Sequence, residues 1–164
     1  MSRLLVKEAE TQKQIADALK VRRTVFVEEQ KIPEEVELDG RDSEAEHVLA
    51  YFDNDPIGCA RIRHADKGIR IERMAVLEKY RGHGFGRFLL NYTIALIRRR
   101  YPKEMIYVHS QKDVEEFYKR AGFVTKGKIF YEAGIPHVMM ILEKKNRFLS
   151  IGKMLRKRGP KSSN

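Results

Sequence analysis

The strongest constraint on this chain is a cluster of glycines directly before a long apolar helical pattern. Gly82, Gly84 and Gly86 occupy three of five consecutive positions. Apolar side chains then recur at helical spacing over 84–100, and this segment ends in three arginines, which suit the negative end of a helix dipole. Glycines let a backbone approach a ligand closely, and a helix N-terminus presents free N–H groups to an anion. The pattern predicts a phosphate-binding turn between a strand and a helix; a tight turn that binds nothing is the alternative.

Known phosphate-binding spacings narrow the choice of ligand. The chain contains no G-x-x-x-x-G-K-[ST] sequence, which excludes a P-loop, and its G-x-G-x-G spacing differs from the dinucleotide G-x-G-x-x-G. The dinucleotide unit also needs parallel strands around its helix, whereas an antiparallel meander is expected here. Arg81 and Arg87 flank the glycines and add positive charge.

The strand expected at 69–76 contains an irregularity. Ile69 and Ile71 are apolar at odd positions, whereas Met74 and Val76 are apolar at even positions. Side chains alternate strictly between the faces of a regular strand, so this switch predicts a β-bulge at residues 72–73. A strand covered on both faces is the alternative.

The remaining pattern predicts a mixed α/β (α+β) domain with a largely antiparallel sheet. Thr11 and Gln14 have the spacing of a capping box at the start of a first helix, and residues 28–46 read as an irregular acidic segment. Strands are expected at 4–6, 47–52, 57–63, 69–76, 105–110, 123–130 and 137–142, further helices at 84–100 and 113–121, and a turn at 134–136.

Composition excludes several classes of protein. The 164 residues fit one domain, and 42% apolar with 34% charged residues argue against a disordered or collagen-like chain. No apolar run approaches the roughly 20 residues of a membrane helix, and no secretory signal is visible. Cys59 is the one cysteine, which excludes an internal disulfide and a cysteine-based zinc site; it is expected to be a small core residue. A cytoplasmic location is expected.

The net charge of +10 is unevenly distributed along the chain. Eight of the 33 Lys and Arg residues follow Glu143, so the first 143 residues hold 25 basic against 23 acidic residues. We therefore expect a domain over 1–143 and a basic tail over 144–164. The tail reads either as a short amphipathic helix for an anionic surface, such as a membrane or nucleic acid, or as a solvated extension.

Three segments together resemble the GNAT family of N-acetyltransferases. Arg81-x-x-Gly84-x-Gly86 is similar to the family's acyl-CoA pyrophosphate loop, residues 73–76 to its strand beside the pantetheine arm, and residues 111–123 to its second signature. The resemblance covers residues 3–143. Residues 25–30 and 134–137 resemble the small bacterial branch that includes ElaA and YjcF.

The resemblance implies the GNAT acyl-CoA N-acyltransferase fold, with a mixed sheet flanked by helices and a bulged central strand. It also implies transfer of the acetyl group of acetyl-CoA, as co-substrate, to a primary amine by direct attack, with no metal. The acceptor is expected to be a small-molecule or peptide amine. The residues implied in acetyl-CoA binding are Met74, Ala75, Val76, Arg81, Gly82, His83, Gly84, Phe85, Gly86, Arg87, Gln111 and Phe117.

Direct attack needs a neutral amine and a protonated leaving group, which points to an acid and a base. Tyr118 matches the family's acid position, and a phenol is protonated at pH 7. Glu72, at the expected bulge, is the candidate base if burial raises its pKa; a strand glutamate paired with a neighbouring arginine is the alternative. His47 and His137 begin strands and are further candidates at the substrate site, or else half-exposed histidines.

Other interpretations remain open at this stage. The acidic side chains of 34–46 either line an amine site or form a solvated loop. A GNAT-like module that binds an acyl-CoA without catalysis, as a sensor or partner protein, is one rival function. A nucleic-acid-associated protein acting through the basic tail is another. The acceptor and the oligomeric state stay undetermined, a dimer being one option.

Overall fold

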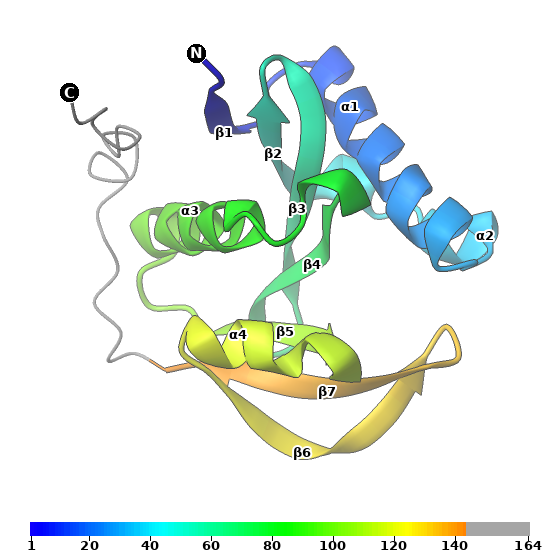
Figure 1. The fold of residues 1–164 in the computed structure, drawn as a ribbon. Coiled ribbons are helices and arrows are strands. Elements are labelled where there is room, and N and C mark those ends of the chain that lie inside the picture. Colours follow the sequence, from blue (N-terminus) through cyan, green and yellow to red (C-terminus); the bar gives the residue numbers. More distant parts are fainter. Residues whose placement is uncertain (144–164) are drawn as a thin grey trace.

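A seven-stranded sheet forms the centre of the molecule, with strand order β1-β2-β3-β4-β5-β7-β6 (Figure 1). The computed structural model describes residues 1–143, so the expected tail over 144–164 lies outside the described residues. β4 and β5 run parallel, whereas the other neighbouring strands pair antiparallel. The strands are β1 (Leu4–Glu8), β2 (Glu46–Phe52), β3 (Asp55–Ala65), β4 (Gly68–Val76), β5 (Ile106–Gln111), β6 (Phe123–Glu132) and β7 (Ile135–Leu142). The predicted mixed, mostly antiparallel sheet is confirmed.

Helices cover both faces of this sheet. They are α1 (Gln12–Arg22), which continues as a π-helix, η1 (Arg23–Glu29), then α2 (Glu34–Glu37), α3 (Phe85–Arg100) and α4 (Glu115–Arg120), with 3₁₀ turns η2 (Asp42–Glu44), η3 (Glu78–Tyr80) and η4 (Lys112–Val114). The predicted capping box is present at the start of α1. On β2, Leu49 packs in the cluster with α1 and η1, whereas its neighbours Val48 and Ala50 pack in the cluster with α3. Because neighbouring strand residues face opposite ways, α1 and α3 lie on opposite faces.

The predicted bulge lies in β4. Cys59 of β3 pairs with Ala75 and Arg61 pairs with Glu72, so Arg73 and Met74 together oppose one residue of β3. Arg73 has a φ of +53°, a left-handed conformation that is uncommon outside glycine. The extra residue shifts the alternation by one position, so Met74 and Val76 pack against the same apolar cluster as Ile69 and Ile71, as the switch in parity indicated.

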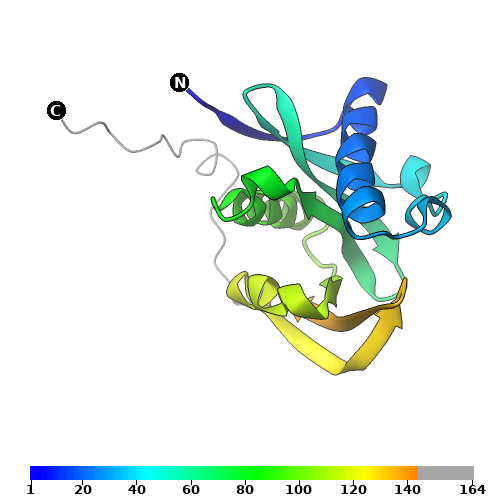
Figure 2. The same cartoon turned by 45° about the vertical axis from the view of Figure 1, so that its right-hand side comes forward.

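The sheet splits where β4 and β5 meet. Their pairing covers only Ile69–Ile71 against Ile106–Val108. Beyond the bulge β4 continues to pair with β3, while β5 continues along β7 as far as Gln111. Figures 1 and 2 show the two parts of the sheet diverging, with α3 on one part and α4 on the other.

Some boundaries differ from the sequence expectations. The helix expected at 113–121 begins as the 3₁₀ turn η4, and the β6–β7 turn is formed by residues 133–134, so Ile135 and Pro136 already pair with β6. The acidic segment is not wholly irregular, since it contains α2 and η2. Cys59 is buried in the core, as expected. Within residues 1–143, no helix is both long and apolar enough to cross a membrane.

Candidate active site

A cavity of about 1270 Å³ occupies the split between β4 and β5. Its walls are formed by the bulged part of β4, the C-terminal end of β5, the glycine turn, α4 and the β6–β7 turn. The candidate site residues that line it are Glu72, Met74, Ala75, Val76, Arg81, Gly82, Gly84, Gly86, Arg87, Gln111, Phe117, Tyr118 and His137. Most of the residues singled out from the sequence are therefore brought together in one place.

The glycine turn leads into α3 with a backbone that suits an anion. Gly82 and Gly84 have φ values of +79° and +81°, and Gly84 is the N-cap of α3. A Cβ on either glycine would meet nothing within 4 Å, so the space beside the turn is open. No acidic side chain occupies the first turn of α3. The free N–H groups and the positive end of the helix dipole therefore face the cavity, and no carboxylate on that turn neutralises their positive charge.

Two members of the predicted loop do not line the cavity. Phe85 packs against Phe52 and Tyr80 at ring-centroid distances of 5.4 and 6.4 Å, and His83 stacks beside Phe85 at 5.8 Å. Phe85 packs against the apolar core, whereas His83 is exposed, and their contact with the cofactor stays a prediction.

Arg81 lies at the mouth of the cavity and is already bonded. Its Nε donates to Val76 O at 2.8 Å, and its Nη2 donates to both carboxylate oxygens of Glu29 at 3.0 and 2.8 Å. These contacts connect the end of β4 to η1. An incoming anion would meet a guanidinium held in place but shared with a carboxylate.

A second contact crosses the split near the same point. The Gln111 side chain on β5 donates from Nε2 to Gln30 Oε1 at 2.8 Å, directly after η1. Among the described residues, β4 has no strand partner on its β5 side beyond Ile71. The backbone of Met74–Val76 therefore forms an exposed strand edge inside the cavity, as expected for the segment beside a pantetheine arm.

Tyr118 lies on α4 and is buried at the cavity wall. The rings of Phe117 and Phe123 contact it edge-on, at centroid distances of 5.1 and 5.6 Å. Burial raises the pKa of Tyr118 well above its ordinary value. The phenol is therefore protonated at neutral pH and can donate a hydrogen bond or a proton.

Glu72 is buried and held by two guanidinium groups. Arg63 Nε donates to its Oε1 at 2.7 Å, and Arg61 Nη2 donates to its Oε2. Burial alone would raise the pKa of Glu72, but the hydrogen bond and charge of Arg61, with Arg70 and Arg63, outweigh it and lower the pKa. The prediction that the pKa of Glu72 is raised is wrong. Arg61 and Arg63 are distant from Glu72 in the sequence, but β3 pairs with β4 and brings them beside it.

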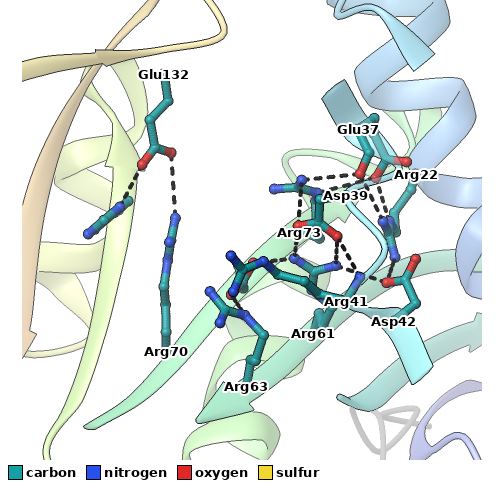
Figure 3. Close-up of polar contacts among 12 residues, drawn as sticks. Arg22, Glu37, Asp39, Arg41, Asp42, Arg61, Arg63, Arg70, Arg73 and Glu132 are labelled. Carbon is teal, nitrogen blue, oxygen red and sulfur yellow. Dashed lines mark hydrogen bonds and ion pairs between the residues drawn. The ribbon is translucent and has the colours of Figure 1, made fainter. Parts of the chain in front are cut away.

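Glu72 belongs to a larger ion-pair network (Figure 3). Two of its arginines, Arg22 and Arg61, are fully buried. Arg22 contacts Glu37 at 2.5 Å and Asp42 at 2.6 Å, and Arg61 contacts Asp39 at 2.7 Å and Asp42 at 2.9 Å. Three carboxylates of the acidic segment, those of Glu37, Asp39 and Asp42, are thus paired with arginines from α1, β3 and β4. Glu35 and Glu44 of the same segment are exposed.

The two candidate histidines are placed differently. His47 is buried on β2, outside the cavity, and its Nε2 donates to Asp42 O at 2.9 Å. His137 lines the cavity, and its Nδ1 donates to Ile135 O at 2.7 Å. A third histidine, His109 on β5, also lines the cavity and was missed from the sequence, although its position two residues before Gln111 on the same strand was a signal.

Among residues 1–143, no group of three or more His, Cys, Asp or Glu side chains is arranged to hold a metal ion.

The sheet is split, and a glycine-rich helix N-terminus lies at the split. This arrangement defines an acyl-CoA acyltransferase fold. The chain belongs to the GNAT acetyltransferase family, since a family model described as an acetyltransferase (GNAT) domain matches residues 3–144. YjcF of Bacillus subtilis, an uncharacterized N-acetyltransferase, is 34% identical over 134 residues, which are 81% of this chain and 95% of YjcF.

Solved structures agree with this assignment. The crystal structure of Escherichia coli ElaA has a TM-score of 0.78 at 27% identity, covering 86% of this chain and all of that one. An acyl-CoA N-acyltransferase from Pseudomonas aeruginosa has a TM-score of 0.76 at 27% identity, over 87% of this chain and all of that one. The predicted fold and the predicted relation to ElaA and YjcF are confirmed.

Proposed function

We propose that the protein transfers the acetyl group of acetyl-CoA to a primary amine by direct attack. One observation carries the proposal: a single cavity joins an open glycine turn, an exposed strand edge and a buried phenol. These are an anion cradle, a partner for amide groups and a proton donor, which are the three things a CoA thioester and its leaving thiolate need.

Binding begins at the glycine turn. The N–H groups of the turn and of the first turn of α3 donate hydrogen bonds to the pyrophosphate oxygens, and Arg87 adds charge from the cavity wall. Arg81 contributes its guanidinium while it keeps its bond to Val76 O. The free edge of Met74–Val76 pairs with the amides of the pantetheine arm. The arm thus takes the hydrogen-bonding positions beside β4 that β5 does not occupy beyond Ile71.

Chemistry then takes place beside the bulge. A neutral amine attacks the thioester carbonyl carbon, the C–S bond breaks, and Tyr118 gives its proton to the departing sulfur. Because burial raises its pKa, Tyr118 stays protonated at neutral pH until the thiolate forms. Small-molecule and peptide amines are the acceptor classes that the family implies.

Calorimetric titration with acetyl-CoA tests the cofactor site. Gly84→Glu places a negative charge beside the phosphates, and we expect binding to weaken at least 100-fold. Gly127→Glu is the matched control, because Gly127 has the same φ of +81° and equally open surroundings but lies on β6, outside the cavity. Equal affinity in the two variants would contradict the assignment.

Tyr118→Phe distinguishes an enzyme from a non-catalytic acyl-CoA module. The substitution keeps the ring and its packing but removes the proton donor. We expect release of free thiol from acetyl-CoA in the presence of primary amines to fall about 10²-fold or more, with unchanged acetyl-CoA affinity. A wild-type protein that binds acetyl-CoA but transfers to no amine would support the sensor function instead.

A further inference from the structure

A second polar cluster lies on the cavity wall opposite the arginine network. Glu132, at the end of β6, contacts Arg70 Nη2 of β4 at 3.5 Å and His109 Nδ1 of β5 at 2.7 Å. His137 of β7 brings its Nε2 to 3.9 Å from the same carboxylate. All four side chains line the cavity. Figure 3 shows Glu132 and Arg70 paired apart from the network around Arg61.

His109 occupies the position where the sheet opens. Val108 is the last β5 residue that pairs with β4, so His109 is the first residue within the split. Val108 packs in the same apolar cluster as Tyr118. Because neighbouring residues of a strand face opposite ways, His109 approaches the split from the face opposite Tyr118. The geometry thus places a nitrogen base and a phenol on the two sides of one opening.

The contacts of His109 define which nitrogen is available. Burial would raise the pKa of Glu132, but the hydrogen bond from His109 and the charge of Arg70 outweigh it and lower the pKa, so the carboxylate is ionised and only accepts. Nδ1 of His109 therefore donates to Glu132, which leaves the lone pair on Nε2. The ring of Phe130 meets the imidazole edge-on at 4.9 Å, and Tyr107 lies at 5.8 Å on the same strand.

Neither Glu72 nor His137, the two candidate bases predicted from the sequence that line the cavity, has this freedom. Both carboxylate oxygens of Glu72 are bonded to arginines. His137 uses Nδ1 for Ile135 O and turns Nε2 toward Glu132. His109 alone among these three combines a fixed Nδ1–H with a second nitrogen that no hydrogen bond or ion pair within residues 1–143 occupies.

We propose that His109 is the catalytic base that deprotonates the acceptor ammonium, and that Glu132 is its positioning residue. The inference rests on the proposed acetyltransferase function. Nε2 takes one proton from R–NH₃⁺ and passes it to solvent. The neutral nitrogen then attacks, the C–N bond forms and the C–S bond breaks. Tyr118 protonates the thiolate, and the second proton lost by nitrogen restores its hydroxyl. The products are the amide, CoA–SH and one proton.

Turnover measurements on His109→Gln and His64→Gln test the role; His64 is exposed on β3, outside the cavity. The assay follows thiol release from saturating acetyl-CoA with butylamine, a lysine-containing peptide and a peptide with a free N-terminus. We expect His109→Gln to lower kcat about 10²-fold or more at pH 7 with unchanged acetyl-CoA affinity, whereas the His64→Gln control changes it less than about 3-fold. The loss should shrink by pH 9.5, where more amine is neutral without help. Glu132→Gln should lower kcat by a smaller factor.

Three results would overturn the proposal. Equal turnover of wild type and His109→Gln at pH 7 would remove the base role while leaving the transferase intact. A wild type that binds acetyl-CoA but acetylates none of the three amines would remove the proposed function itself. Nitrogen-15 NMR of the histidine rings in the wild-type protein needs no variant: the Nδ1–H tautomer of His109 is expected, and the Nε2–H tautomer would contradict the mechanism.

Discussion

The buried ion-pair network makes a quantitative prediction about stability. Arg61 is fully buried, and its guanidinium bonds to Asp39 at 2.7 and 2.9 Å, to Asp42 at 2.9 Å and to Glu72. Arg61→Met removes this charge and leaves three carboxylates short of a partner. Breaking a buried pair from one side costs about 3–5 kcal/mol. Asp39 and Asp42 are partly exposed, so water recovers some of this loss and we take about 3 kcal/mol.

The effect has a definite pH dependence. The pKa values of Asp39, Asp42 and Glu72 are all lowered in the folded protein: burial opposes this, but hydrogen bonds and charges of Arg61, with Arg22 for Asp42, outweigh it. A lowered pKa in the folded state adds stability above the unfolded value of about 4, and this stability is lost as the pH falls below it. The variant lacks most of this contribution, so its gap to wild type should narrow from pH 5 to pH 3.

Thermal and urea unfolding followed by circular dichroism measure this gap. At pH 7 we expect the midpoint of Arg61→Met to fall by about 10 °C, at roughly 3 °C per kcal/mol for a domain of this size. Arg23→Met is the control, since Arg23 makes an exposed ion pair with Glu34, and exposed pairs contribute under about 1 kcal/mol. A loss below 1 kcal/mol at pH 7, or an equal gap at pH 7 and pH 3.5, would refute this reasoning.

Two further predictions concern packing. Gly68→Ala should destabilise the protein by about 3 kcal/mol in urea unfolding, because a Cβ at this position would lie 2.3 Å from Met105 O. Gly40→Ala is the control, since Gly40 has open space around it and a φ of +75°, and its loss of stability should be about 1–2 kcal/mol. Equal losses in the two variants would contradict the predicted clash. Burial raises the pKa of Cys59 to about 12, so Ellman's reagent should modify it only after unfolding; rapid labelling of the native thiol would disprove this burial.

The fold was largely predictable from local patterns. The parity switch around Glu72, the glycines at 82–86 and the Thr11–Gln14 capping box all act through nearby backbone, and each predicted its local structure. The apolar patterns also predicted the order of the elements, and the resemblance of short motifs agreed with that order.

The electrostatics of the site were not predictable in the same way. The partners of Glu72 are residues of β3, 9 and 11 positions away, and Arg22 is 15 positions from Glu37. The pairing of His109 with Glu132 spans 23 positions across two strands. Such contacts depend on strand register, which the sequence pattern predicts only coarsely.

The short junction between β4 and β5 has a mechanical consequence. Three residue pairs, Ile69–Ile71 against Ile106–Val108, are the shared strand pairing of the two parts of the sheet. Each part keeps its own longer antiparallel pairings if these three pairs bend. The distance between β4 and β5 beyond these three pairs is therefore the most easily deformed distance in the sheet. A molecule that bonds to both β4 and β5 would hold the two strands at a fixed distance. It would stiffen the whole domain far more than its own contact area suggests.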